Sequence, residues 1–374
     1  MSRPQALGRS NGPDGLRFNP GGSRNLDVLR MIAVTLVVQD HLFTFWGNPT
    51  YLGFIVPLRL GRFGVILFFV HTALVLMASM ERQWKKTGRH RFISIFLIRR
   101  GFRIFPLAVT ALVVTVLFNI PGQSDVHRLS HVRYGAKTLV ANLALVQNVA
   151  GGANTSILSP MWSLAFEWQM YLVLPFLYFI GRRASTIVPM LVIWAIPELL
   201  LLSYGAQVDQ FNRTHAFWKI PDWGTYGPCF LAGVVAFLIA EKMEPAPVLP
   251  WLALPLAIAA MFVPVMATSQ FSKFVPAALI VALIIPYCRE IRRGWFSEFA
   301  RIVVRYSYGV YLFHLIGIWI AFVRLKHEPL AIQWLVFAAL VVTIPVAAYH
   351  LVERPAIVLG NRIAVRLEPP VSNS

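Results

Sequence analysis

Long apolar runs separated by short polar segments dominate the pattern along the chain. A membrane-spanning helix needs about 20 mostly apolar residues, and about ten stretches meet this requirement. They lie near residues 26–46, 62–80, 103–120, 160–180, 185–203, 223–241, 249–268, 272–288, 306–323 and 331–350. Segment 138–150 is also apolar, but it is short and ends in a Gly–Gly pair. The pattern predicts an all-α polytopic membrane bundle of about ten transmembrane helices, with 138–150 re-entrant or interfacial.

Basic residues orient this bundle in the membrane. Lys and Arg are concentrated in the N-terminal tail, in the run from Glu81 to Arg103, at Arg182 and Arg183, and in the loop 289–305. All four regions fall on one side if 138–150 does not cross, and the positive-inside rule makes that side cytoplasmic. We therefore expect a multi-pass protein of the plasma or inner membrane with both termini in the cytoplasm.

Composition agrees with a membrane protein. Hydrophobic residues make up 57% of the chain and charged residues 13%, and the mean hydropathy is +0.62. These values exclude an ordinary soluble domain. The net charge of +18 would suggest nucleic acid in a soluble protein. Here topology and contact with anionic membrane lipids account for it, and we expect no nucleic-acid partner.

The chain divides into three parts on the same pattern. Residues 1–25 are polar and rich in Pro and Gly, so we expect a disordered cytoplasmic tail there. Residues 26–355 form the transmembrane domain, and 356–374 form a cytoplasmic C-terminal tail. Two cysteines are too few for a disulfide framework.

An Arg/His pair lies inside the first predicted span. Arg30 and His41 are eleven residues apart, so they share a helix face about 16 Å apart along the axis. Ionisable groups at membrane depth are costly and are functional candidates by default. His41 is a candidate general base or covalent acyl carrier; the alternative is a histidine satisfied by a neighbouring helix. Asp27 lies three residues before Arg30 and can pair with it.

A second basic pair begins the third predicted span. Arg100 and Arg103 share one face at the cytoplasmic surface, and guanidinium groups suit phosphate oxygens. We expect them to bind the phosphates of a nucleotide-tailed donor; the alternative is binding of lipid head groups.

Two further polar stripes occur on apolar spans. Ser163, Glu167 and Tyr171 are four residues apart and share a face. Glu167 orients a catalytic group or forms a salt bridge between helices, and the sequence leaves both open. The second stripe consists of Ser307, Tyr311 and His314, and His71 is an isolated candidate on another span. Such side chains must face the bundle interior or water. For Glu353, helix capping or pairing with an arginine of the basic loops is the favoured role.

Taken together, these strings resemble the acyltransferase-3 family of integral membrane acyltransferases, which includes sugar O-acetylases. The matching positions run in order along almost the whole chain: Asp27, Arg30, Ala33, His41, Gly61, Gly64, Val65, Phe68, Phe69, Val70, Arg100, Arg103, Pro106, Trp162, Ser163, Leu164, Glu167, Tyr171, Pro175, Ser307, Tyr308, Tyr311, His314, Glu353 and Pro355. The chain departs from the family at His71-Thr72-Ala73, where many members carry Ser-Gly.

The resemblance implies transfer of an acyl group, usually acetyl, from cytoplasmic acyl-CoA to a hydroxyl of a carbohydrate or lipid-linked glycan, without a metal. Arg100 and Arg103 would hold the CoA phosphates, and His41 would act on the acceptor hydroxyl. Arg30 would stabilise negative charge, while Glu167, Tyr311 and His314 would shape the channel. The runner-up is a transporter that uses the same charges for substrate and protons. A scaffolding protein would leave the buried histidine and glutamate unexplained. The sequence does not determine the oligomeric state.

Overall fold

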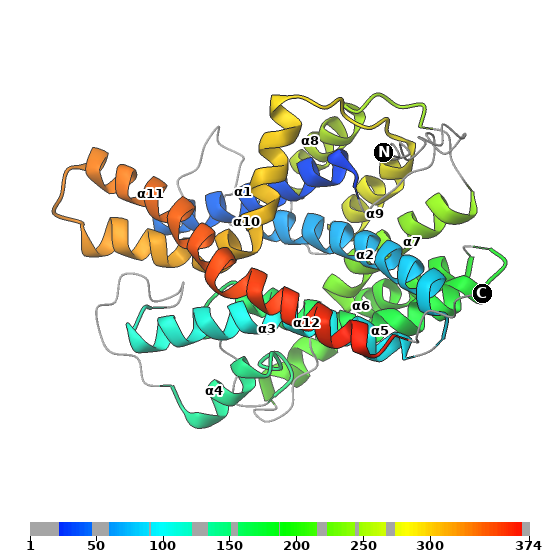
Figure 1. Ribbon diagram of the computed structural model, residues 1–374, viewed down its shortest axis with the longest axis horizontal. Helices are drawn as coiled ribbons and strands as arrows, with labels where there is room; N and C mark the ends of the chain where they lie inside the picture. Colours follow the sequence, from blue (N-terminus) through cyan, green and yellow to red (C-terminus); the bar gives the residue numbers. More distant parts are fainter. Residues whose placement is uncertain are drawn as a thin grey trace, which may run out of the picture.

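The computed structural model describes residues 22–46, 60–89, 91–121, 134–150, 156–186, 188–214, 223–243, 247–266 and 274–368. Within these ranges the chain forms helices and no β-strand (Figure 1). Almost all of the predicted N-terminal tail lies outside the described residues. The first helix begins at Arg24, two residues before the predicted transmembrane domain, and the Ser23 hydroxyl caps it by accepting from the Leu26 amide.

Each predicted span corresponds to a helix. The bounds are α1 Arg24–Phe45, α2 Leu60–Thr87, α3 Phe92–Leu117, α4 Ala136–Leu143, α5 Met161–Arg183, α6 Val188–Thr214, α7 Trp223–Lys242, α8 Ala253–Met266, α9 Phe274–Ile284, α10 Trp295–Ile318, α11 Leu330–Ala348 and α12 Arg354–Arg366. Among the described residues, six helices are long and apolar enough to cross a membrane, and two shorter apolar helices are Ala253–Phe262 and Phe274–Tyr287. The chain is therefore a helical membrane bundle, as predicted.

The predicted C-terminal tail begins as a helix. A π-helical turn at Tyr349–Glu353 joins α11 to α12, so the helix continues from Leu330 to Arg366 over 37 residues. At 1.5 Å per residue it is far longer than a hydrocarbon core of about 30 Å requires. Its last part packs along α3, where the Phe102 side chain lies against Gly360.

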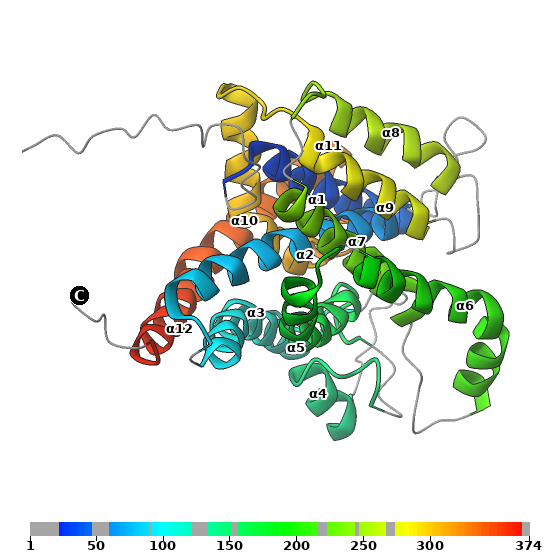
Figure 2. The ribbon, with the colours of Figure 1, turned by 90° about the vertical axis from the view of Figure 1, so that its right-hand side faces the viewer.

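Segment 138–150 does not form a spanning helix. α4 has only eight residues, which rise about 12 Å, and Figure 2 shows it at the edge of the bundle.

The relative direction of α1 and α10 also indicates that segment 138–150 does not cross the membrane. Arg30 of α1 binds Ser307 of α10, and His41 binds His314 further along both helices. The two helices are therefore parallel. An odd number of crossings must separate parallel spans; the seven predicted spans between them satisfy this, and a crossing at α4 would violate it.

Glycines allow the central helices to pack closely. A Cβ atom at Gly64 of α2 would lie 2.6 Å from the Ala33 carbonyl oxygen of α1. At Gly233 of α7, the Val70 carbonyl oxygen would be 2.3 Å away. Small residues permit such backbone contact between membrane helices. The Gly61/Gly64 pair therefore fixes α2 against α1, and α2 holds the middle of the bundle.

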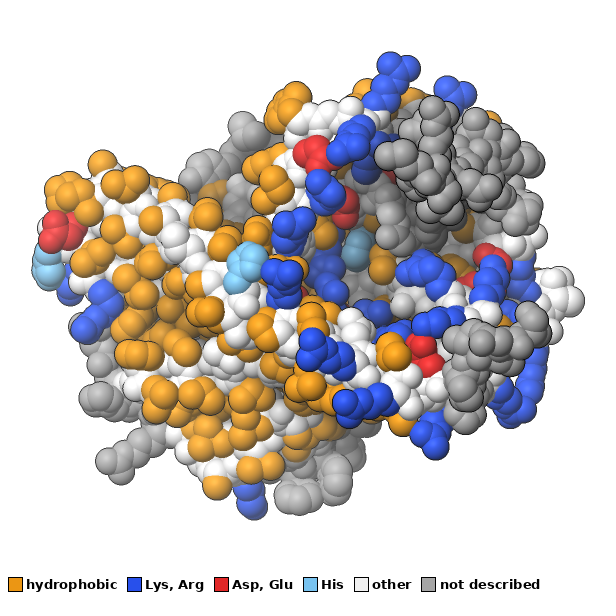
Figure 3. Space-filling view, in the orientation of Figure 1, with side chains coloured by type: hydrophobic (Ala, Val, Ile, Leu, Met, Phe, Trp, Pro, Cys, Tyr) orange, Lys and Arg blue, Asp and Glu red, His pale blue; other side chains and the backbone are white. Residues whose placement is uncertain are grey.

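Charged residues gather at one end of the bundle. Glu368 binds Lys86 and Arg99, which brings the end of α12 to the turn between α2 and α3. Glu81 of α2 binds Arg182 at the end of α5. In Figure 3, Lys and Arg are concentrated over one part of the visible surface, while the surface over α10 and α11 is mostly hydrophobic. Of the basic regions that the sequence predicted to share a side, the run from Glu81 to Arg103 meets Arg182, while most of the N-terminal tail lies outside the described residues.

Candidate active site

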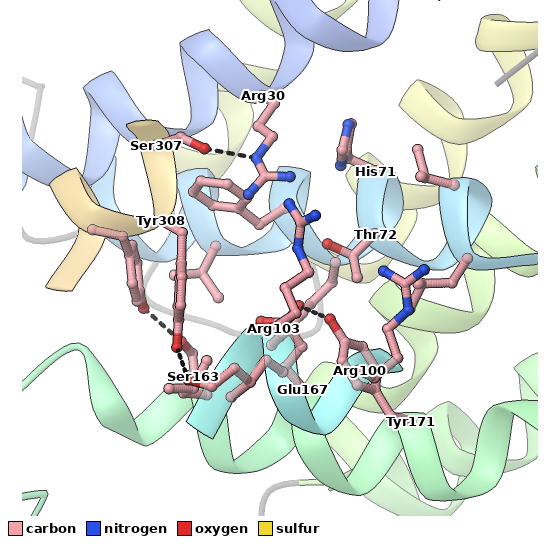
Figure 4. Close-up of a pocket in the computed structure, with 18 residues that line it drawn as sticks. Arg30, His71, Thr72, Arg100, Arg103, Ser163, Glu167, Tyr171, Ser307 and Tyr308 are labelled. Atoms are coloured by element: carbon pink, nitrogen blue, oxygen red, sulfur yellow. Dashed lines mark hydrogen bonds between the residues drawn. The ribbon is translucent and has the colours of Figure 1, made fainter. Parts of the chain in front are cut away.

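A cavity enclosing about 850 Å³, its open mouth included, lies between five helices. α1 contributes Arg30, α2 contributes His71 and Thr72, and α3 contributes Arg100 and Arg103. The α5 and α10 residues complete the wall: Ser163, Leu164, Glu167, Tyr171, Ser307, Tyr308 and Tyr311. Charged and hydroxyl side chains from distant parts of the sequence thus meet inside an apolar bundle (Figure 4).

Three guanidinium groups share this cavity. Arg30 donates from Nε to the Ser307 hydroxyl at 2.9 Å and lies 5.8 Å from the centre of the Phe68 ring. Arg100 donates to the Ser79 hydroxyl at 3.2 Å. Figure 4 shows Arg103 extending from α3 toward Arg30. Among the described residues, no carboxylate lies within 4 Å of any of the three. Buried like charges are costly unless an anion offsets them, so the cavity is suited to an anionic ligand.

The stripe on α5 faces the cavity as its spacing predicted. Glu167 accepts a hydrogen bond from the Tyr171 hydroxyl one turn later. The salt-bridge interpretation of Glu167 is wrong within the described residues, because no basic group lies within 4 Å of its carboxylate. One carboxylate, itself held by a tyrosine, therefore shares the cavity with three arginines.

Tyr311 forms the boundary between this cavity and a pair of histidines. Its hydroxyl lies 2.5 Å from the Ser163 hydroxyl and donates to the Pro160 carbonyl at 3.1 Å. On its other side, the Tyr311 ring centre lies 6.5 Å from the ring centre of His314. His314 contacts His41, with Nε2 of the former 3.0 Å from Nδ1 of the latter. The histidines lie beyond Tyr311 and do not line the cavity.

The predicted site residues fall into three groups. The cavity brings together nine of them: Arg30, His71, Arg100, Arg103, Ser163, Glu167, Tyr171, Ser307 and Tyr311. His41 and His314 form the separate pair. Asp27 belongs to neither group, and its predicted ion pair with Arg30 is wrong: Arg30 binds Ser307 on α10 instead. A hydroxyl acceptor leaves the guanidinium charge uncompensated, whereas Asp27 would have neutralised it.

Glu353 also differs from its expected role. Its side chain is 2% exposed, it precedes α12 without capping the helix, and one carboxylate oxygen has no hydrogen-bond partner. Within the described ranges it forms no ion pair. Arg99, the sequence neighbour of Arg100, binds Glu368 and Gln83 and does not line the cavity. Among the described residues, the ion pairs therefore lie outside the cavity.

Two contacts of the site were not anticipated. Tyr308 of α10 donates to the Ile104 carbonyl of α3 at 2.8 Å, which ties two walls of the cavity together. His314 contacts His41 rather than lining the channel. Tyr308 follows Ser307 among the positions that match the family, so the sequence pointed to this residue but not to its contact with α3. No local signal pointed to the histidine pair, because its members lie on helices at opposite ends of the sequence.

Comparisons with known proteins agree with this arrangement. The model of a family described as an acyltransferase domain, acyltransferase-3, matches residues 23–351. Nodulation protein 10 of Rhizobium leguminosarum bv. viciae is 25% identical over 92% of this chain and 96% of its own length. Peptidoglycan O-acetyltransferase OatA of Listeria monocytogenes is 30% identical over 40% of this chain, a match that spans 23% of that protein. No solved structure matches. The chain belongs to the acyltransferase-3 family and is a membrane O-acyltransferase.

Proposed function

We propose that this protein transfers an acyl group, acetyl in the simplest case, from cytoplasmic acyl-CoA to a hydroxyl of a carbohydrate or glycosylated acceptor. One observation carries the donor half of this proposal. Arg30, Arg100 and Arg103 share a cavity in which no described carboxylate lies within 4 Å of them.

The chemistry of the three arginines favours a phosphorylated donor. Arginine keeps its charge under all ordinary conditions and presents several N–H donors in a fixed plane. Charge-assisted contacts to phosphate are stronger than neutral hydrogen bonds. Acyl-CoA carries phosphates at one end and a thioester at the other, so binding its phosphates here places the thioester deeper in the bundle.

His41 supplies the reacting nitrogen in this proposal. The imidazole takes the proton of the acceptor hydroxyl while the oxygen attacks the thioester carbon. The new C–O bond forms as the C–S bond breaks, and the proton passes from the imidazole to the departing thiolate. In the covalent alternative, His41 first displaces the thiolate and the hydroxyl then attacks the acyl-imidazole, its proton again ending on the thiol.

The position of His41 favours an acceptor from the extracytoplasmic side. His41 lies 17 residues into α1, about 26 Å along the helix axis, while the basic end of the bundle holds the start of α1. Tyr311 separates it from the arginine cavity. The name of one relative, a peptidoglycan O-acetyltransferase, supports a carbohydrate acceptor. On this proposal the basic end is cytoplasmic, and the protein lies in the plasma or inner membrane.

The enzyme assay uses the purified protein in detergent with radiolabelled acetyl-CoA and a panel of soluble glycans. We expect label on glycan hydroxyls, and we expect His41→Ala to abolish transfer while CoA binding persists, because the arginine cavity is untouched. Normal transfer by a correctly inserted His41→Ala protein would refute the role of His41. Transfer in detergent, where no gradient exists, would count against the transporter hypothesis; substrate uptake into sealed vesicles by the same protein, without any transfer, would favour it.

Sidedness is tested in sealed vesicles whose donor sites face outward. A membrane-impermeant acceptor is trapped inside in one sample and left outside in the other, with acetyl-CoA outside in both. We expect acetylation of the trapped acceptor. Modification confined to the outside acceptor would overturn transfer across the membrane and leave an enzyme that works on one side.

A further inference from the structure

The hydrogen bonds of the histidine pair determine which ring nitrogens carry hydrogen. His314 Nδ1 lies 2.9 Å from the Val310 carbonyl oxygen. A carbonyl only accepts, so Nδ1 of His314 must be the donor. The Nε2 of a neutral His314 is then an acceptor, and it faces His41 Nδ1 at 3.0 Å.

His41 follows the same rule. Its Nδ1 lies 2.8 Å from the Val37 carbonyl oxygen and 3.0 Å from His314 Nε2. Both neighbours are acceptors, so the hydrogen of His41 resides on Nδ1 and is shared between them. A neutral His41 therefore has its lone pair on Nε2. The exposed fractions of 8% for His41 and 0% for His314 leave little water to replace these contacts.

We infer that His314 is a positioning residue that holds His41 in the tautomer with an unprotonated Nε2. The inference rests on the proposed function of His41. In this role the neutral imidazole of His314 takes the place of the carboxylate in a Ser–His–Asp triad. The carboxylate there fixes the tautomer of the catalytic histidine and stabilises its imidazolium form. When His41 takes a proton at Nε2, the charge faces two acceptors, Val37 O and His314 Nε2. Both reaction routes described above need the same nitrogen.

The geometry of the helices supports a fixed pair. α1 and α10 are parallel, and the Arg30–Ser307 contact sets their register about two to three turns away from the histidine pair. The imidazole rings are 4.8 Å apart between centres at 56°. Asp40, the acid next to His41 in sequence, packs instead against Gly61 of α2. His314 thus orients His41 from a helix other than its own.

Two substitutions separate positioning from structure. His314→Gln places an amide oxygen near the site of Nε2 and keeps an acceptor, whereas His314→Leu removes it. We expect His314→Leu to lower kcat by about 10- to 100-fold, the effect of one hydrogen bond to a charged group. His314→Gln should recover most of kcat. The KM for acetyl-CoA and the Kd for CoA should be unchanged in both, because the arginine cavity lies beyond Tyr311. Equal losses in the two variants, or a weakened CoA affinity in His314→Leu, would overturn the inference.

A spectrum completes the test. ¹⁵N NMR of histidine-labelled protein in detergent reads the tautomer directly, with His41→Ala used to assign the signal. Hydrogen on Nδ1 of His41 is the expected result, and hydrogen on Nε2 overturns the inference. Because the spectrum needs no activity, it distinguishes a failure of this pair from a failure of the proposed reaction.

Discussion

Arg99 and Arg100 are neighbours in the sequence, yet they belong to two regions with opposite chemistry. Arg99 lies at the polar end of the bundle, where Glu368 is 3.0 Å away. Arg100 lies in the cavity with Arg30 and Arg103, where hydroxyl groups and aromatic rings are the contacts. Successive residues of a helix are about 100° apart around its axis. Arg99 therefore points to Glu368, whereas Arg100 points into the cavity, where no described carboxylate lies within 4 Å of it.

The comparison distinguishes two uses of arginine in a membrane protein. At the polar end, acids and bases are matched: Glu81 binds Arg182 and Lys85, and Glu368 binds Arg99 and Lys86. Such pairs fix helix ends and contribute modestly to stability. In the cavity the positive charge exceeds the negative. A charge kept uncompensated in a buried place is costly, so its retention points to a ligand that supplies the anion.

The largest effect is expected from removing a cavity arginine. Arg103→Ala should raise the Kd for CoA about 10- to 150-fold, because a hydrogen bond to a charged group is worth about 1.5–3 kcal/mol. Arg103→Lys should recover only part of the affinity, since a point charge cannot reproduce the guanidinium fork. Titration calorimetry with CoA measures both. Arg99→Ala is the matched control on the same helix, and an equal loss there would erase the distinction between the two regions.

An intermediate effect is expected from giving the cavity an acid. Ser79 accepts from Arg100, so Ser79→Asp places a carboxylate beside this guanidinium and makes it resemble Arg99. We expect CoA affinity to fall about tenfold, because the acid competes with phosphate for the same donors. Ser79→Asn, which has the size of Asp without its charge, should bind CoA as the wild type does. Unchanged binding by Ser79→Asp would mean that Arg100 does not contact the donor.

The smallest effect is expected at the polar end. Arg99→Ala should lower stability by about 1 kcal/mol, seen as a drop of a few degrees in Tm in detergent, because Glu368 retains Lys86 as a partner. Lys86, whose side chain is 60% exposed, should contribute less than about 0.5 kcal/mol when changed to Ala. CoA binding and transfer should be preserved in both variants. A loss of donor affinity in either would place the polar end within the binding site.

Local sequence patterns predicted the helices and their inward faces well. The shared face of Ser163, Glu167 and Tyr171 is a consequence of helical periodicity alone, and all three line the cavity. The same periodicity predicted that Arg30 and His41 share a face, and both contact α10. Patterns of this kind succeed because the backbone of a segment surrounded by lipid has to form a helix. The side of the helix on which a residue lies then follows from its position in the sequence.

Partners could not be predicted in this way. Asp27 was in reach of Arg30 by spacing, but Ser307 is the partner. His41 was assigned to the arginine channel, but it binds His314, 273 residues away, beyond Tyr311. Each of these outcomes depends on how α1 packs against α10.

By itself, then, the sequence determined that this chain is a helical membrane bundle, where its helices lie, and which polar side chains turn inward. Its ordered motifs also determined the family. Only the tertiary structure decided which arginines remain without an acid and which nitrogen of His41 carries hydrogen. The physical reason is that helical periodicity acts over a few residues, whereas a charge or a hydrogen bond is settled by whichever group another helix brings within about 3 Å.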